Sequence, residues 1–268
     1  MDNRRIGFFD SGLGGLTCIP HLLSKLPNEH IVYFGDTART PYGSKSVNTI
    51  EKFSIQIADY LVSQDVKMIV IACNTISATC LGALRRRFPG LPIVGIIEPT
   101  AQFIADTELS PVNIGILGTK VTINSGVYRN SIRRRTDKAR VFSLACPAFV
   151  PLIEEGFQGD VMDMVIRHYL DEFIRENKIQ KLVMGCTHYP LLAENFARLY
   201  PQVGLINPSA VVVDEVERIL VQGDALAQPN TAEHACFASD LSDNFLKMID
   251  RVFEGAEDVR VDFKEFAG

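Results

Sequence analysis

The 268-residue sequence contains no apolar run of the roughly 20 residues needed to span a lipid bilayer. Its first residues, Met1-Asp2-Asn3-Arg4-Arg5-Ile6, enter a predicted strand at once, without the apolar segment and cleavage site of a secretory signal. We therefore expect a cytoplasmic protein with no membrane partner. In that compartment its six cysteines are expected to stay reduced.

Short motifs that bind common cofactors and metals are also missing. No pair of cysteines has CxxC spacing and no pair of histidines has HxxxH spacing, so no zinc site is predicted. The glycines after the first predicted strand fall at positions 12, 14 and 15, which is not the GxGxxG spacing of dinucleotide-binding loops. No P-loop Lys-Ser/Thr pair follows them. We expect neither a metal nor a cofactor.

Positive charge is not in excess. The formal net charge is −5 and the pI is about 5.6, which argues against nonspecific binding to nucleic acid or membranes. Two basic runs, at residues 85–87 and 133–135, fall in predicted helices and are expected to form solvated helix faces. With 47% apolar and 22% charged residues, the composition is that of a compact protein, and 268 residues suggest two domains.

Short apolar runs alternate with helical segments along the chain. Strands are predicted at residues 5–9, 31–34, 68–72 and 93–97, and helices are predicted between them. After residue 208, helices are expected at 211–221 and 240–253. Strands separated by helices of this length predict parallel βαβ units, and therefore an α/β fold.

The pattern restarts halfway along the chain. Ile6-Gly7-Phe8 has an echo at Ile114-Gly115-Ile116, and Cys73 has one at Cys186. The strand ending at Phe34 corresponds to one at residues 141–144. Similar order at a nearly constant offset predicts two related α/β halves. The tail is expected to return to the first half.

Functional side chains in open parallel sheets gather at the carboxyl ends of the strands. Here these ends hold small hydroxyls, amides, acids and two thiols, which suits a small zwitterionic ligand. The residues are Asp10, Ser11, Asp36, Cys73, Asn74, Thr75, Glu98, Thr119, Cys186, Thr187 and His188.

The two thiols carry most of the functional argument. Cys73 and Cys186 each end an apolar run and each precede a predicted helix, whose N-terminus is expected to lower the thiol pKa. One thiol could serve as a nucleophile in acyl or amide transfer. Two thiols in equivalent places fit two opposed acid/base groups better, which would invert a carbon acid held between them.

Several of these residues also have purely structural interpretations. The glycines that follow Asp10 are explained by a strand-to-helix turn. Asn74 and Thr75 are equally suited to capping a helix. A histidine such as His188 more often lies in a surface loop, although its position two residues after Cys186 favours a role in proton transfer.

Six motifs together resemble bacterial glutamate racemase. They are Asp10-Ser11-Gly12-Leu13-Gly14-Gly15, Gly35-Asp36, Pro41-Tyr42-Gly43, Ala72-Cys73-Asn74-Thr75, Glu98-Pro99 and Gly185-Cys186-Thr187-His188-Tyr189-Pro190. The resemblance extends from the first strand to about residue 222. It implies two similar parallel-sheet α/β domains related by pseudo-symmetry, with the active site in the cleft between them. The first would comprise residues 1–97 and 210–268, and the second residues 98–209.

The resemblance also implies an activity and a set of roles. The activity is cofactor-independent interconversion of L- and D-glutamate, which supplies D-glutamate for peptidoglycan. Cys73 would be the base for the D-enantiomer and Cys186 the base for the L-enantiomer, with Asp10 and His188 as their partners. Asp36 and Glu154 would support the site. The substrate-binding positions would be Asp10, Ser11, Pro41, Tyr42, Gly43, Asn74, Thr75, Thr119, Thr187 and His188. Homodimers are common in the family.

Three alternatives stay open from the sequence. A related racemase acting on aspartate or a hydantoin would use the same thiols, although the motifs after Asp10 and around Cys186 favour glutamate. A thiol hydrolase or amidase that pairs Cys186 with His188 is the second alternative, and it leaves Cys73 without a role. A non-catalytic, two-domain amino-acid-binding or regulatory protein is the third, and the paired thiols weigh against it.

Overall fold

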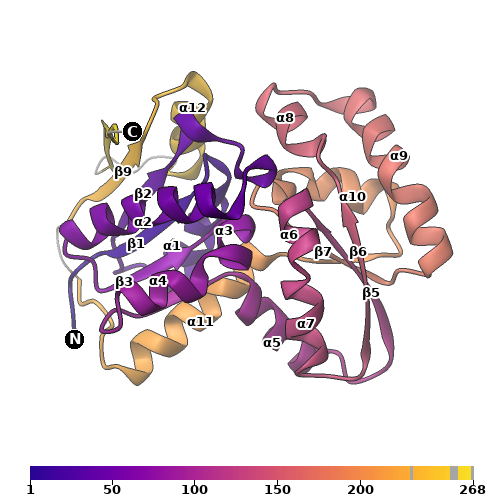
Figure 1. Ribbon diagram of the computed structural model, residues 1–268, viewed down its shortest axis with the longest axis horizontal. Helices are drawn as coiled ribbons and strands as arrows, with labels where there is room; N and C mark the ends of the chain where they lie inside the picture. Colours follow the sequence, from indigo (N-terminus) through magenta and orange to yellow (C-terminus); the bar gives the residue numbers. More distant parts are fainter. Residues whose placement is uncertain (230–231, 254–258, 267–268) are drawn as a thin grey trace.

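The strands form two parallel sheets placed side by side, as the computed structural model shows (Figure 1). The structure describes residues 1–229, 232–253 and 259–266. The first sheet has the order β10-β9-β2-β1-β3-β4, with strands β1 (Ile6–Asp10), β2 (Ile31–Gly35), β3 (Met68–Ile71), β4 (Ile93–Gly95), β9 (His234–Ala238) and β10 (Val259–Phe263). The second has the order β6-β5-β7-β8, with strands β5 (Val112–Gly118), β6 (Ala139–Ala145), β7 (Lys181–Gly185) and β8 (Gly204–Ile206).

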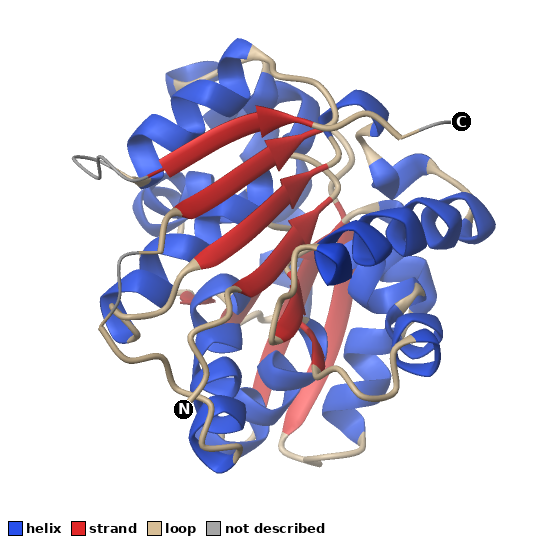
Figure 2. Cartoon of the chain, turned by 90° about the vertical axis from the view of Figure 1, so that its left-hand side faces the viewer, coloured by secondary structure: helices blue, strands red, loops and turns tan. Residues whose placement is uncertain are grey.

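The predicted repeat is confirmed by this strand order. β2-β1-β3-β4 in the first sheet has the same arrangement as β6-β5-β7-β8 in the second. Cys73 follows β3 and Cys186 follows β7, so the two thiols lie at equivalent positions. The tail adds β9 and β10 to the first sheet, which the sequence analysis had expected only as a returning segment. All the strand pairs are parallel, as predicted for an α/β fold (Figure 2).

Helices cover both faces of each sheet (Figure 2). In the first half they are α1 (Ile19–Lys25), α2 (Val47–Ser63), α3 (Asn74–Thr79), α4 (Leu81–Arg87) and α12 (Asp243–Val252), and α5 (Ile97–Thr107) and α11 (Pro208–Gln222) lie between the two halves. In the second half they are α6 (Lys120–Ser125), α7 (Val127–Arg133), α8 (Phe149–Glu154), α9 (Gly159–Asn177) and α10 (Ala193–Leu199). Short 3₁₀ turns are η1 (Gly14–Cys18), η2 (Thr37–Arg39), η3 (Tyr42–Ser44) and η4 (Tyr189–Leu192). None of the helices in the described ranges is long and apolar enough to cross a membrane.

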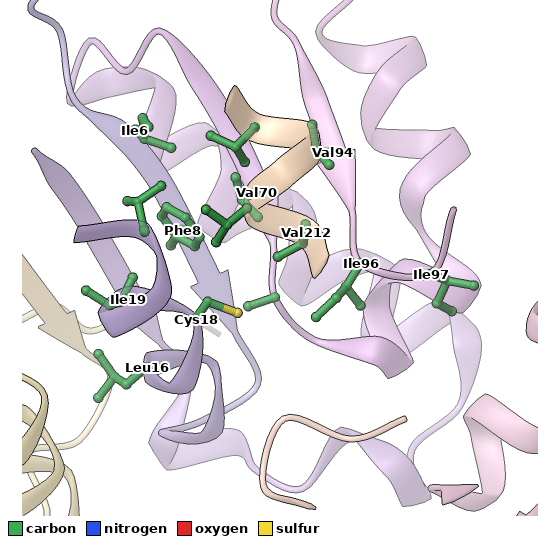
Figure 3. Packing of buried hydrophobic residues seen from close by; sticks show 14 of the residues in the cluster. Ile6, Phe8, Leu16, Cys18, Ile19, Val70, Val94, Ile96, Ile97 and Val212 are labelled. Carbon is green, nitrogen blue, oxygen red and sulfur yellow. The ribbon is translucent and has the colours of Figure 1, made fainter. Parts of the chain in front are cut away.

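Burial on both faces explains why the strands read as continuous apolar runs. Every residue of β1, β2 and β3 is buried. One apolar core packs Phe8 and Val70 of the first sheet against Val212 of α11 (Figure 3). The same core continues to Ile116 and Val183 of the second sheet. The two halves are therefore joined by a shared apolar layer that includes α5 and α11.

The prediction of a strand through Ile97 is wrong. β4 ends at Gly95 and α5 begins at Ile97, so Glu98 and Pro99 lie in the first turn of a helix. A proline is tolerated there because its missing N–H would have no helical partner, and a carboxylate is favoured by the helix dipole. Glu98 pairs with Arg85 at 3.1 Å on the surface and does not join the other strand-end residues.

A buried ion pair fixes the returning tail. Lys67 Nζ lies 2.7 Å from Glu29 Oε2, and both side chains are 2% exposed. The same ammonium group donates to the carbonyls of Asp2 and Ala225, and Glu29 Oε1 accepts the N–H of Ala227. This pair therefore holds four segments of the first half together.

Replacing Lys67 with methionine should destabilise the protein strongly. The change leaves the Glu29 carboxyl group buried without its cation, a loss that typically costs about 3–5 kcal/mol. Arg87→Met is the matched control, because its pair with Asp59 is nearly half exposed and such pairs contribute about 0–1 kcal/mol. Urea unfolding measures both. Equal midpoints for the two variants would contradict a structural role for the buried pair.

Candidate active site

The two halves enclose one small cavity at the carboxyl ends of their strands. Its walls come from both halves and hold most of the polar residues predicted from the sequence. They are Ser11, Thr40, Pro41, Tyr42, Gly43, Cys73, Asn74, Thr75, Thr119, Val150, Cys186, Thr187 and His188. The volume of this cavity is about 20 Å³, which is little more than one water molecule requires.

Cys73 reaches this cavity from the first half. It follows β3 and is the N-cap residue of α3, and its side chain is buried. Its Sγ lies 3.5 Å from Ser11 Oγ. The expected lowering of its pKa by the helix is wrong, because burial and then the nearby Asp10 carboxylate raise the pKa of Cys73 above its ordinary value. In this closed arrangement Cys73 is a protonated thiol, and therefore an acid.

Asp10 lies beneath the cavity at the end of β1, fully buried. Its Oδ2 accepts the backbone N–H of Gly15 at 2.9 Å, and Thr187 Oγ1 lies 3.4 Å from Oδ1. Burial raises the pKa of Asp10, against the opposing influence of His188 and the Gly15 N–H. A carboxylate with a raised pKa beside a thiol is suited to taking a proton from it.

Cys186 reaches the cavity from the second half and has a different partner. His188 Nδ1 lies 3.9 Å from Cys186 Sγ, and His188 Nε2 lies 2.9 Å from Glu154 Oε1. Burial alone would lower the pKa of His188, but Cys186 and Glu154 together raise it to about 10. The His188 imidazole therefore lies where it can exchange a proton with Cys186. Cys186 is thus placed to act as a base.

Asp36 does not reach the cavity. It is fully buried, and accepts hydrogen bonds from the Tyr42 hydroxyl, from Arg39 Nε at 2.8 Å and from Ser239 Oγ at 2.7 Å. Tyr42 lines the cavity, so the effect of Asp36 on the site passes through the tyrosine that it holds.

Hydroxyl groups from both halves meet at the cavity. Thr75 Oγ1 lies 3.1 Å from Thr119 Oγ1 and 3.3 Å from Thr122 Oγ1, and the last two are 3.0 Å apart. Thr75 belongs to α3 of the first half, whereas Thr119 caps α6 of the second. Such a cluster of donors is suited to a carboxylate ligand.

Comparisons of sequence and of structure lead to the same family. The Asp/Glu/Hydantoin racemase family model matches residues 17–216. A glutamate racemase from Geobacter metallireducens is 39% identical over 258 residues, covering 95% of this chain and 94% of that one. This chain belongs to the glutamate racemase family.

Solved structures of the family share the whole architecture. The glutamate racemase of Francisella tularensis, solved in complex with D-glutamate, has a TM-score of 0.90 at 36% identity and covers 99% of this chain and 98% of its own. A glutamate racemase isoform from Bacillus anthracis has a TM-score of 0.91 at 30% identity, with 99% of each chain covered. The two parallel-sheet α/β domains predicted from the resemblance are confirmed.

The two halves approach closely because glycines of the first half face side chains of the second. A Cβ atom on Gly14 would lie 2.5 Å from both His188 Nδ1 and Thr187 Oγ1. A Cβ atom on Gly43 would lie 2.6 Å from the Cβ of Thr119. Any side chain at these two positions of the first half would therefore hold the second half away from it.

Some residues at the site were not predicted. Thr40 and Val150 line the cavity, and Tyr128 donates to Asn74 Oδ1 at 2.6 Å. Asn244 of the tail donates to the backbone carbonyl of Glu154 at 2.7 Å. Thr40 stands beside the Pro41 motif and could have been included with it. The other three lie in helices whose sequences carry no local signal.

His188 should stay protonated well above neutral pH. An NMR titration of the imidazole signals should place its midpoint near pH 10, because Cys186 and Glu154 outweigh burial. His21 is the internal control, since burial lowers its pKa below 6.5. Glu154→Gln removes one of the two groups that raise the His188 pKa and should lower the His188 midpoint. A His188 midpoint near that of His21 would contradict the paired arrangement.

The same ion pairing has a consequence for stability. The pKa of His188 is raised from 6.5 to about 10 in the folded protein, so its charge contributes stability that is complete below pH 6.5. That contribution is lost as the pH rises through about 10. The difference in unfolding free energy between the wild type and His188→Asn should therefore shrink over this range.

Proposed function

We propose that this protein interconverts L- and D-glutamate by moving a proton between two thiols and the substrate Cα. The observation that carries the proposal is the placement of Cys73 and Cys186, one from each half, in the wall of a single cavity. One thiolate removes the Cα proton, and the electron pair left behind is delocalised into the substrate carboxylate. The other thiol then donates a proton to the opposite face, which inverts the stereocentre.

We assign the direction of each thiol from the family pattern. Cys186 is the base for L-glutamate and Cys73 the base for D-glutamate. The surroundings of the thiols support this division, because Cys186 faces a protonated His188 whereas Cys73 is a buried thiol beside the Asp10 carboxyl group. Asp10 takes the proton from Cys73 before D-glutamate reacts. His188, which is paired with Glu154, exchanges a proton with Cys186.

We propose that the remaining cavity residues hold the substrate. Ser11, Asn74 and the threonine hydroxyls face the substrate's carboxylates and ammonium group, while Asp36 acts by holding Tyr42. The resemblance to the family also supports Pro41, Gly43, Thr119 and Thr187 as positions that bind the substrate. The domain division at residues 97/98 and 209/210 is part of the same proposal.

We further propose that the protein works in the cytoplasm, in the supply of D-glutamate for peptidoglycan, and as a homodimer. Six free, buried cysteines suit a reducing compartment. The glutamate racemases to which the chain is similar support the metabolic role.

A circular-dichroism assay tests the reaction directly. Purified protein, dialysed exhaustively against chelator and given no cofactor, should racemise D- or L-glutamate to an equal mixture. The described residues contain no group of three acidic, histidine or cysteine side chains arranged to hold a metal. Activity restored only by added metal or pyridoxal phosphate would overturn the mechanism, and activity on aspartate or a hydantoin instead of glutamate would change the substrate.

The alanine variants of the two thiols test the division of labour. Cys73→Ala and Cys186→Ala should each lower racemisation by at least about 10²–10⁴-fold, because each removes an essential acid/base group. In D₂O, Cys73→Ala should still exchange the Cα proton of L-glutamate, and Cys186→Ala that of D-glutamate. Cys236→Ala, which removes a buried thiol of β9, is the control and should retain activity. Wild-type racemisation in either of the first two variants would exclude the two-thiol mechanism.

A further inference from the structure

Asn74 contains a buried hydrogen-bond donor that the fold does not use. The residue is 2% exposed, lies next to Cys73 and lines the cavity. Among the described residues, its Nδ2 has no hydrogen-bond partner. A buried amide group without a partner is costly, and at a residue that lines a cavity a bound ligand can supply the missing acceptor.

The other end of the same amide is held by the second half of the chain. Tyr128 of α7 donates its hydroxyl hydrogen to Asn74 Oδ1 at 2.6 Å. The Tyr128 side chain is 3% exposed, and burial raises the pKa of its phenol. The hydroxyl is therefore protonated at every pH at which the enzyme works, and it remains a donor.

An amide presents an acceptor at one end and donors at the other. Once Tyr128 holds Oδ1, the NH₂ group of Asn74 is directed away from Tyr128. Asn74 lines the cavity that also contains Cys73. The chemistry that an NH₂ group recognises there is an anionic oxygen, such as a carboxylate of an amino acid.

Tyr128 also contacts the other catalytic strand end. Its ring lies against Gly185, where an added Cβ atom would come within 3.3 Å of Tyr128 Cε2. Gly185 is the last residue of β7 and precedes Cys186. Tyr128 thus contacts both Gly185, which precedes Cys186 in the second half, and the Asn74 amide, which lies next to Cys73 in the first half.

We propose that Tyr128 is a positioning residue that aims the Asn74 amide at a carboxylate of the substrate. The proposal rests on the racemase function argued above. Because Tyr128 and Asn74 belong to different halves, the hydrogen bond exists only when the halves are together. Closure of the site therefore sets the orientation of the amide.

Tyr128→Phe removes the hydroxyl and keeps the ring. The bond to Asn74 affects the ground state and the transition state alike, so KM for both enantiomers should rise about three- to tenfold with kcat nearly unchanged. Tyr200→Phe is the matched control, since its hydroxyl donates to Asp171 at 2.7 Å elsewhere in the second half. Unchanged kinetics in Tyr128→Phe would overturn the proposal.

A double-mutant cycle separates positioning from a general structural effect. If Tyr128 acts through Asn74, adding Tyr128→Phe to Asn74→Ala should change KM no further. Additive losses would show that Tyr128 acts separately, and would overturn the proposal. Asn74→Asp tests the orientation without changing Tyr128. It keeps an acceptor for the phenol but turns a negative charge towards the substrate, so KM should rise above that of Asn74→Ala. A KM equal to or below that of Asn74→Ala would contradict the orientation.

A readout independent of activity keeps the two proposals distinguishable. The side-chain NH₂ signals of Asn74 in a ¹⁵N correlation spectrum should shift in Tyr128→Phe and stay in place in Tyr200→Phe. If the wild type fails to racemise glutamate while the Asn74 signals respond, the proposed function fails and the positioning contact stands. Asn74 signals that do not respond would overturn the contact itself.

Discussion

The site depends on the close approach of two sheet edges. Parallel strands end at one edge of their sheet, so each half presents its polar residues and one cavity-lining thiol there. One edge alone provides a thiol on one side of a substrate only. The inverting arrangement requires the edges to face each other across a gap of one small molecule, and Gly14 and Gly43 make that approach sterically possible. The shared apolar layer around Val212 keeps the halves joined behind the gap.

The pseudo-symmetry of the backbone does not extend to the electrostatics. Cys73 and Cys186 occupy equivalent positions, yet one lies beside a buried carboxyl group and the other beside an imidazole paired with Glu154. Two thiols in identical surroundings would favour the same protonation state, whereas proton transfer across a substrate requires one acid and one base at a time. The difference between Asp10 and His188 therefore provides the chemical asymmetry that this proton transfer requires and that the duplicated backbone lacks.

Much of this architecture could be predicted from the sequence, because buried parallel strands leave a local signature. The apolar runs ending at Cys73 and Cys186 made it possible to predict two strands, the repeat and the residues at these strand ends. The tail strands β9 and β10 were missed because the pairing of β9 with β2, and of β10 with β9, depends on the tertiary fold. Glu98 was misplaced because the apolar run after β4 continues into a buried helix face. The raised pKa of Cys73 could not be anticipated, since it depends on burial and on a carboxylate from another strand.

The small cavity adds a kinetic constraint to this arrangement. Room for little more than one water molecule cannot admit an amino acid with two carboxylates, so the halves must part before substrate enters. Many of the polar contacts between them are suited to being broken and remade. Thr75 meets Thr119, and Tyr128 meets Asn74, through hydroxyl groups that water can replace. The apolar layer behind the cavity has no such substitute, because separating it would expose residues such as Val212 and Ile116 to water.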